Sequence, residues 1–281
     1  MSERLIGQET GVVVVVAVAR PTPASLRWWL DHPNIVRTIS VAAFLALWEY
    51  FGLKVDPLFL AAPSKIVEAA IELIRSGELL SAFLATFYPF AIGMAITVVG
   101  GIVIGVAMAQ WRLLEYILDP FINALYAIPR IALVPLIMLW AGLGVGGKVV
   151  ILVSIAIFPV IINTFSGIRD VRGSMLEVGR AYGATKPQIF FKIVLPAAIP
   201  FVMTGIRLAV GMGIIGIIVG EFFTAQTGLG GMIVTYANVF ATAKLFVPII
   251  VIGIMGVVLT ELVQALERRL SRWRELERDR G

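Results

Sequence analysis

The sequence predicts an all-helical integral membrane protein with six transmembrane helices. Two observations carry this prediction. Hydrophobic residues make up 59% of the 281 residues and charged residues only 15%, a balance far from that of a soluble domain. The apolar residues are also gathered into runs long enough to cross a bilayer core of about 30 Å, and short charged stretches separate these runs. One integral domain in the lipid bilayer accounts for the whole length.

Charged residues delimit the six expected spans. The first lies between Arg37 and Lys54 and contains Glu49, and the second lies in the uncharged stretch between Glu78 and Arg112. The spans are expected at about 38–53, 82–108, 118–141, 149–168, 197–221 and 245–265, within a transmembrane domain over 38–265. The longest loop, 169–196, joins the fourth and fifth spans.

Six spans place both termini on one side, and the distribution of charge selects the cytoplasm. Lys and Arg accumulate in cytoplasmic segments, and this orientation leaves only five of them on the outside: Lys54, Lys65, Arg75, Lys148 and Lys244. The N-terminal segment 1–37 and the basic tail 266–281 are therefore predicted to be cytoplasmic. The same bias explains the net charge of +5, so no nucleic acid is expected as a partner.

The N-terminal segment is not expected to cross the membrane. Its Val-rich run, 11–19, is too short, and the leader before it carries two glutamates beside one arginine, unlike the positive leader of a signal peptide. The tryptophan pair at 28–29 follows an arginine, which favours an interfacial elbow helix. His32, the single histidine, is interpreted as an interfacial polar residue.

A short amphipathic helix is expected outside the membrane, between the first two spans. Ser64 can cap its N-terminus and Gly77 can end it. The apolar positions fall on one face: Ile66, Ala70, Leu73 and Ile74. The opposite, charged face is interpreted as solvated, and a docking partner outside the membrane would meet this region.

The stretch GLGVGGKV, 142–149, imitates a phosphate-binding loop without meeting its requirements. Such a loop follows a strand, precedes a helix and has a hydroxyl side chain after the lysine to bind Mg²⁺. Here Val149 follows Lys148, and membrane spans flank the glycines. We interpret them as a tight external turn, so no nucleotide is expected on this chain and ATP would have to act on another.

No catalytic residue, metal ligand or cofactor site is predicted. The chain has no cysteine, which excludes disulfides and thiol nucleophiles. Paired carboxylates, a metal-binding cluster and a Ser/His/Asp set are all missing from positions where they could do chemistry. The chain is therefore not expected to be an enzyme.

The 169–196 loop carries the signals of two short helices. Met175–Tyr182 can form the first, and Gly183 can end it by taking a positive φ. Thr185 and Gln188 then fit a capping box, with a proline in the first turn of the second helix. Such a pair would project from the membrane as a compact knob. A loop that lies on the lipid headgroups, held by its five cations, is the alternative.

The spacing within this loop resembles the EAA signature of ABC importer permeases, E-A-A-x3-G-x9-I-x-L-P. From Glu177 the sequence reads E-V-G-R-A-Y-G, nine further residues and I-V-L-P. Val178 and Gly179 replace the two alanines, and Gly179 is expected to cost the first helix up to about 1 kcal/mol. The similarity extends over about 57–273, where the motifs of spans three to five resemble the permeases for nitrate, taurine and alkanesulfonates.

The resemblance implies one subunit of an ATP-driven importer in the bacterial inner membrane. Its partners would be a second, identical permease, two ATPase subunits that bind ATP and Mg²⁺, and an extracytoplasmic solute-binding protein. The loop would be the coupling helix that docks on the ATPase, through Glu177, Arg180, Ala181, Tyr182, Gly183, Ala184, Ile193, Leu195 and Pro196. The expected solute is a small anion such as a sulfonate, taurine or nitrate. A gradient-driven secondary transporter or channel is the alternative, but the inverted repeats typical of that class are not visible.

Three polar residues inside the spans are candidates for the translocation path, because intramembrane polar groups usually face a cavity or a partner. Arg130 could meet an anion, or it could snorkel or pair with Glu49 or Glu221. Asn163 could line the path or make an interhelical hydrogen bond. Glu221 is the third candidate.

Other intramembrane positions are interpreted as structural. Arg207 is expected to make a structural contact in the fifth span. The pairs Gly101/Gly105 and Gly216/Gly220 have the small-x3-small spacing that lets helices approach closely. They are therefore expected at helix–helix contacts.

Overall fold

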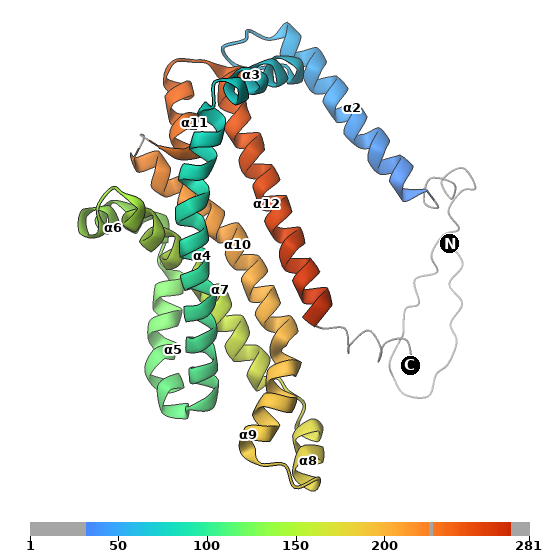
Figure 1. Cartoon of the computed structure of the whole chain (residues 1–281), viewed down its shortest axis with the longest axis vertical. Helices are drawn as coiled ribbons and strands as arrows, with labels where there is room; N and C mark the ends of the chain where they lie inside the picture. Colours follow the sequence, from blue (N-terminus) through green and yellow to red (C-terminus); the bar gives the residue numbers. More distant parts are fainter. Residues whose placement is uncertain (1–31, 225–226, 271–281) are drawn as a thin grey trace, which may run out of the picture. The chain divides into compact units, whose positions relative to one another are not determined.

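The computed structural model of the chain describes residues 32–224 and 227–270, and these are helical without a strand. The elements in chain order (Figure 1) are α2 (Pro33–Lys54), α3 (Pro63–Arg75), α4 (Glu78–Gln110), α5 (Arg112–Ala127), the 3₁₀ turn η1 (Arg130–Leu133), α6 (Val134–Ala141), α7 (Val145–Arg169), α8 (Gly173–Ala181), α9 (Lys186–Ile189), the π-helical turn η2 (Phe190–Val194), α10 (Leu195–Thr224), α11 (Gly228–Asn238) and α12 (Thr242–Leu270). The Val-rich run, the predicted elbow helix and most of the basic tail lie outside the described residues.

The all-helical membrane architecture is confirmed. Five helices are long and apolar enough to cross a bilayer: α2, α4, α7, the continuous helix Lys186–Phe223, and α12. Five of the six expected spans fall inside them. The first begins at Pro33 rather than near residue 38. The contacts divide the chain into a unit that ends at Trp48 and a second unit, from Glu49, that contains everything described below.

The third expected span, 118–141, is not a single helix. α5 and the segment Arg130–Ala141 meet at an angle of 89°. Ile128, at the bend, is extended with ψ 136°, as expected for a residue before a proline. Pro129 has no N–H to continue the α5 hydrogen-bond ladder. The single span expected here is therefore replaced by two helices with a bend between them.

The helices α4 and α7 pack closely and run in the same direction. A Cβ added at Gly93 would lie 2.9 Å from a side-chain methyl of Leu152, and one added at Gly105 would lie 2.8 Å from the Cβ of Thr164. The contact farther along α4 is also the one farther along α7, so the two helices run parallel. Gly101 also lies in this contact, so the first predicted pair of packing glycines is confirmed.

α10 packs on α7 in the opposite direction. A Cβ at Gly216 would lie 3.1 Å from the Cα of Leu152, and one at Gly167 would lie 2.5 Å from the Cβ of Phe201. The second predicted glycine pair is thus also at a helix contact. Because α4 and α7 run in parallel, the bent pair α5–α6 must return the chain from one end of the bundle to the other. It therefore serves as one crossing of the bundle.

α3 begins two residues earlier than expected, because Ala62 rather than Ser64 is its N-cap. Pro63 is its first residue, and Ser64 instead donates its backbone N–H and its hydroxyl to the Glu49 carboxylate, at 3.0 and 2.7 Å. Ser64 therefore forms its hydrogen bonds with the Glu49 carboxylate rather than with the backbone of the first turn of its own helix. The hydrogen bonds also fasten the start of α3 to the end of α2.

The buried face of α3 is rotated slightly from the expected one. Ile66, Ala69 and Leu73 are buried, whereas Ile74 is 62% exposed. Gly77 has φ +77° directly after the helix, as predicted for the residue that ends it. The amphipathic helix is therefore confirmed, with Ala69 in place of Ile74 on its buried face.

Candidate functional site

The loop after α7 folds into two short helices with a glycine elbow, as predicted. Gly183 has φ +73° and donates its N–H to the carbonyl of Arg180 at 2.9 Å, and Ala184 donates to Gly179 at 3.0 Å. These two bonds form a Schellman motif that ends α8. The Thr185 N–H donates to Oε1 of Gln188 at 2.8 Å in the predicted capping box. We call α8, the elbow and α9 the knob.

Gly179, which departs from the family signature, has a packing role in the knob. It is buried, and a Cβ at this position would lie 2.8 Å from Cδ1 of Ile193 and 3.3 Å from Cγ1 of Ile189. The glycine lets α8 lie directly against the helix that follows the elbow. Its cost in helix propensity is thus offset by a closer contact within the knob.

The residues predicted to form the ATPase contact fall into two groups. Glu177, Arg180, Ala181, Tyr182 and Gly183 are exposed at the tip of the knob. The half-buried group consists of Ala184 in the elbow and, after α9, Ile193, Leu195 and Pro196. Tyr182 is 88% exposed, and an exposed aromatic side chain of this kind is typical of a surface that a partner protein covers.

The knob continues into the transmembrane helix without a flexible linker. The fifth expected span was to begin near 197, but the helix starts at Lys186 and runs to Phe223. Pro196 cannot donate an α-helical hydrogen bond, and the chain passes this point through η2, where the Leu195 N–H bonds to the Phe190 carbonyl. The second helix of the knob and α10 are therefore parts of one helical segment.

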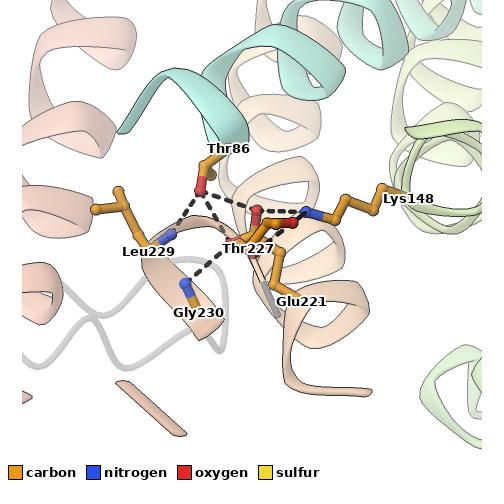
Figure 2. Close-up of polar contacts among 6 residues, drawn as sticks. All are labelled: Thr86, Lys148, Glu221, Thr227, Leu229 and Gly230. Carbon is orange, nitrogen blue, oxygen red and sulfur yellow. Dashed lines mark hydrogen bonds and ion pairs between the residues drawn. The ribbon is translucent and has the colours of Figure 1, made fainter. Parts of the chain in front are cut away.

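At the opposite end of α10 from the knob lies a buried ion pair that was not predicted from the sequence (Figure 2). Lys148 Nζ is 3.0 Å from Glu221 Oε1, and the two side chains are only 4% and 0% exposed. The alternative that paired Glu221 with Arg130 is therefore wrong, because Glu221 pairs with Lys148. Lys148 is buried in the first turn of α7 rather than solvated, and the side of the membrane on which it lies stays a prediction.

The surrounding groups satisfy both charges. The Glu221 carboxylate accepts the Gly230 N–H and the Thr86 hydroxyl, each at 2.9 Å, and Thr86 in turn accepts the Leu229 N–H at 2.8 Å. Lys148 also donates to the hydroxyl and carbonyl oxygens of Thr227, at 3.1 and 3.3 Å. The carboxylate also lies at the N-terminus of α11, where the helix dipole favours negative charge. We call these six residues the Lys148–Glu221 cluster.

The cluster joins four helices, because its residues come from α4, α7, α10 and α11. Thr86 comes from α4, Lys148 from the first turn of α7 and Glu221 from the last turn of α10, while the backbone donors begin α11 (Figure 2). Gly228, with φ +94°, leaves no room for a Cβ, which would overlap the Glu221 carboxylate. The glycines after Glu221 were the sequence signal that something packs closely against this segment.

The glycine motif before Lys148 forms the predicted tight turn, although part of it belongs to α7. Gly142 has φ +80°, and α7 already begins at Val145. A Cβ on Gly147 would overlap the carbonyl of Gly142. The turn is thus closed by backbone contact, and it delivers Lys148 into the first turn of a buried helix rather than into solvent.

Arg130 lies at the bend between α5 and η1 and is half-buried. Its guanidinium donates to the backbone carbonyls of Ile155, at 2.9 Å, and Tyr126, at 3.1 Å. It also lies over the rings of Tyr126 and Phe158, 4.8 and 5.3 Å from their centroids. The hydrogen bonds go to carbonyls rather than to Glu49 or Glu221, the carboxylates that the sequence analysis had considered.

Comparison with known proteins identifies the family. Residues 101–273 match the family model described as "Binding-protein-dependent transport system inner membrane component". The chain belongs to this permease family. The match includes the knob, Arg130 and most of the Lys148–Glu221 cluster.

The permease is similar to several curated transport proteins. It is 35% identical to the putative aliphatic sulfonates transport permease protein of Bacillus subtilis, over 83% of this chain and 85% of that protein. It is 30% identical to the formylaminopyrimidine transport permease protein of Halalkalibacterium halodurans, over 85% and 95%. It is 29% identical to the taurine transport system permease protein of Escherichia coli, over 88% and 92%.

A solved structure shows the same fold. The permease matches a chain of the MetNI methionine ABC transporter in an inward-facing conformation with a TM-score of 0.53 and 21% identity, over 69% of this chain and 94% of that chain. The fold is therefore that of an ABC importer permease. Together with its apolar helices, the family match makes the chain a multi-pass inner-membrane transport subunit.

Two further intramembrane polar residues of the permease, Asn163 and Arg207, also make contacts within the protein. Asn163 donates to the Pro159 carbonyl of its own helix at 2.8 Å, rather than to another helix. Arg207 forms an ion pair with Glu267 of α12, so its predicted structural contact is confirmed. That Arg130, Asn163 and Glu221 line the translocation path stays a prediction. No cluster of three or more metal-binding side chains occurs in residues 32–224 and 227–270.

Proposed function

We propose that the chain forms the translocation path of an ATP-driven importer for small organic sulfonates, such as alkanesulfonates or taurine. The observation that carries the proposal is the family match, which covers the knob and the helix that continues it. The solute class is supported by relatives that are named for aliphatic sulfonates in two bacteria, at 35% and 32% identity, and for taurine. Such solutes carry an anionic sulfonate group, which agrees with the negatively charged solute group expected from the sequence.

The knob is proposed to dock on an ATPase subunit, with one ATPase for each of two identical permease chains. Its exposed tip presents Tyr182 and Val178, which are 88% and 57% exposed, beside the charges of Glu177 and Arg180. ATP and Mg²⁺ would bind on the ATPase. When ATP draws the two ATPases together, the knobs would move with them, and the uninterrupted helix Lys186–Phe223 would carry that motion toward Glu221.

The proposed orientation puts the knob and both termini in the cytoplasm. α12 begins at the end opposite the knob, where Lys244 pairs with Glu72 of α3 at 2.8 Å and Thr242 donates to the Leu58 carbonyl at 2.7 Å. This helix of 29 residues then runs toward the knob end, and Glu267 near its C-terminus pairs with Arg207 of α10. The C-terminal tail would therefore emerge on the side of the ATPase, in agreement with its many arginines.

A solute-binding protein is proposed to dock at the end opposite the knob. There α3 and the 240–244 segment line a hollow of about 400 Å³ with charged walls that include Lys65, Glu68 and Lys244. Phe240 beside it is 67% exposed and has φ +53°, a strained conformation for a non-glycine residue. Strain of this kind is concentrated at functional surfaces.

The coupling proposal is tested by replacing Gly183 with valine. A β-branched residue does not adopt φ +73° without strain, so Gly183→Val should disrupt the elbow and lower the amount of ATPase that co-purifies with the tagged permease by about tenfold. Gly173→Val is the matched control, because Gly173 lies at the start of α8 with a negative φ and no atom within 4 Å of an added Cβ. Unchanged assembly and transport in the Gly183 variant would contradict docking through the knob.

The solute class is tested in liposomes that contain the permease and its ATPase, with the solute-binding protein added outside. ATP-dependent uptake of taurine or an alkanesulfonate is the expected result. Uptake of formylaminopyrimidine or riboflavin instead would assign the chain to its relatives of those names, both at 30% identity. Nitrate is tested in the same assay. Transport down a gradient without ATP would overturn the importer proposal in favour of a secondary transporter or channel.

A further inference from the structure

Arg130 lies against a backbone carbonyl that a proline leaves without a helical partner. Pro159 lies inside α7 and has no N–H, so the carbonyl of Ile155, four residues earlier, cannot make its intrahelical hydrogen bond. An unpaired buried carbonyl destabilises a helix, and in a bilayer no water replaces the missing donor. Arg130 Nη1 supplies the hydrogen bond from another segment, at 2.9 Å.

The second terminal nitrogen of the same guanidinium donates a hydrogen bond to the helix on the other side of the bend. Nη2 of Arg130 donates at 3.1 Å to the carbonyl of Tyr126, which lies in the last turn of α5. Carbonyls in the last turn of a helix have no intrahelical donor, and Pro129 prevents the helix from continuing. One fork therefore bridges two backbone acceptors on two helices, one at the 89° bend and the other at a proline site.

Packing reinforces this connection at the same turn of α7. Val134, Ile137 and Met138 of α6 form a buried apolar cluster with Ile151 and Ile155. Ile155 thus contacts α6 through its side chain and Arg130 through its carbonyl. The segment after the bend is held against α7 at a single level of the helix.

We propose that Arg130 is a positioning residue that clamps the bend of the broken span to the proline site of α7, and that it does not bind the transported solute. The proposal rests on the proposed function for its transport measurements. An arginine suits the task because its planar fork presents several donors in fixed directions, whereas a lysine ammonium is a compact point charge on a flexible stem. The guanidinium also lies against the adjacent rings of Tyr126 and Phe158, and this contact lowers its freedom to turn toward a passing anion.

The geometry offers a direct test by rescue. In Arg130→Met the Ile155 carbonyl loses its donor. In Pro159→Ala the restored N–H of residue 159 can bond to that carbonyl within α7. The clamp therefore predicts that Pro159→Ala makes the permease less dependent on Arg130, although these two residues belong to different helices.

The first measurement is ATP-driven uptake by the complete importer in liposomes. Arg130→Met should lower the maximal rate by about tenfold and leave the concentration of loaded binding protein at half-maximal rate unchanged. The maximal rate of Arg130→Lys should fall between the rates of Arg130→Met and the native chain. The double variant Arg130→Met/Pro159→Ala should return to within about threefold of Pro159→Ala alone. A raised half-saturating concentration without rescue would instead make Arg130 a solute ligand and overturn the proposal.

The second measurement uses the purified permease and does not depend on any solute. Arg130→Met should lower the midpoint of thermal unfolding by about 2–4 °C, and the loss should shrink in the Pro159→Ala background. Pro248→Ala in α12 is the matched control, because it restores a helical hydrogen bond that Arg130 does not replace. Equal losses in all three backgrounds would overturn the clamp even if uptake of sulfonates were established. A failure of uptake with an intact rescue of stability would overturn the proposed function alone.

Discussion

The two ends of the helix Lys186–Phe223 are built in opposite ways. At one end the knob is exposed, turns at the left-handed Gly183 and is held mainly by backbone hydrogen bonds of its own. At the other end the Lys148–Glu221 cluster is buried and joins four helices through charged side chains. Under the proposed coupling to an ATPase, the cluster would hold its end of the helix in place while the knob moves.

The cluster is better understood as a device for geometry than for stability. Burying two charges costs several kcal/mol for each ion, and their attraction offsets this cost only when every remaining donor and acceptor is satisfied. Here the carboxylate receives a lysine, a hydroxyl and a backbone N–H, each from a different helix. All three donors can point at the carboxylate in only one arrangement of the helices. The cluster therefore fixes the position of the four helices relative to one another. The knob carries no such requirement, and exposed segments of this kind are typically the least stable parts of a fold.

The largest effect is expected for a substitution that breaks the buried Lys148–Glu221 ion pair. Lys148→Met leaves the Glu221 carboxylate buried without its cation and should destabilise the permease by about 3–5 kcal/mol. Thermal unfolding in detergent measures the loss. The double variant Lys148→Met/Glu221→Leu removes both charges and should be more stable than Lys148→Met. A single variant that unfolds at the native temperature would show that the pair does not hold the four helices.

A smaller effect is expected at the knob. Gln188→Ala removes the side-chain acceptor of the Thr185 N–H and should cost about 1 kcal/mol of local stability. Hydrogen exchange of the amides between 184 and 190 should become faster while the midpoint of global unfolding stays the same. Gln188→Glu keeps an acceptor at this position and serves as the control. A drop in the global midpoint would mean that the knob is not an independent local unit.

The smallest effect is expected for an ion pair in water. Lys65 and Glu68 on α3 are 2.9 Å apart, as close as the buried pair, but their side chains are 57% and 66% exposed. Lys65→Ala should change the free energy of unfolding by less than about 0.5 kcal/mol, and added salt should reduce the difference further. Denaturation at low and high salt checks this. A loss as large as that of Lys148→Met would mean that burial does not explain the contrast.

The sequence sufficed for the helices, the knob and the glycine contacts because these depend on local composition and spacing. Hydropathy located five spans, and the elbow at Gly183 followed from a local capping pattern. The bend at Pro129 also had a local cause, but the expected span ignored it. The partners of Lys148 and Arg130 could not be derived in this way, since one is a carboxylate 73 positions away and the other a carbonyl exposed by a distant proline. Periodicity reports which face of a helix is apolar, and it contains no information about which helix lies opposite.

The length of the helix that begins in the knob sets how far the knob stands from the membrane. At a rise of about 1.5 Å per residue, the 38 residues of Lys186–Phe223 would extend about 57 Å if straight, nearly twice the thickness of a hydrocarbon core of about 30 Å. With the Glu221 end near one surface of that core, well over 20 Å of helix would pass through the opposite headgroup layer. The tip would then stand in water, clear of the lipid, where a soluble protein could grip it from more than one side.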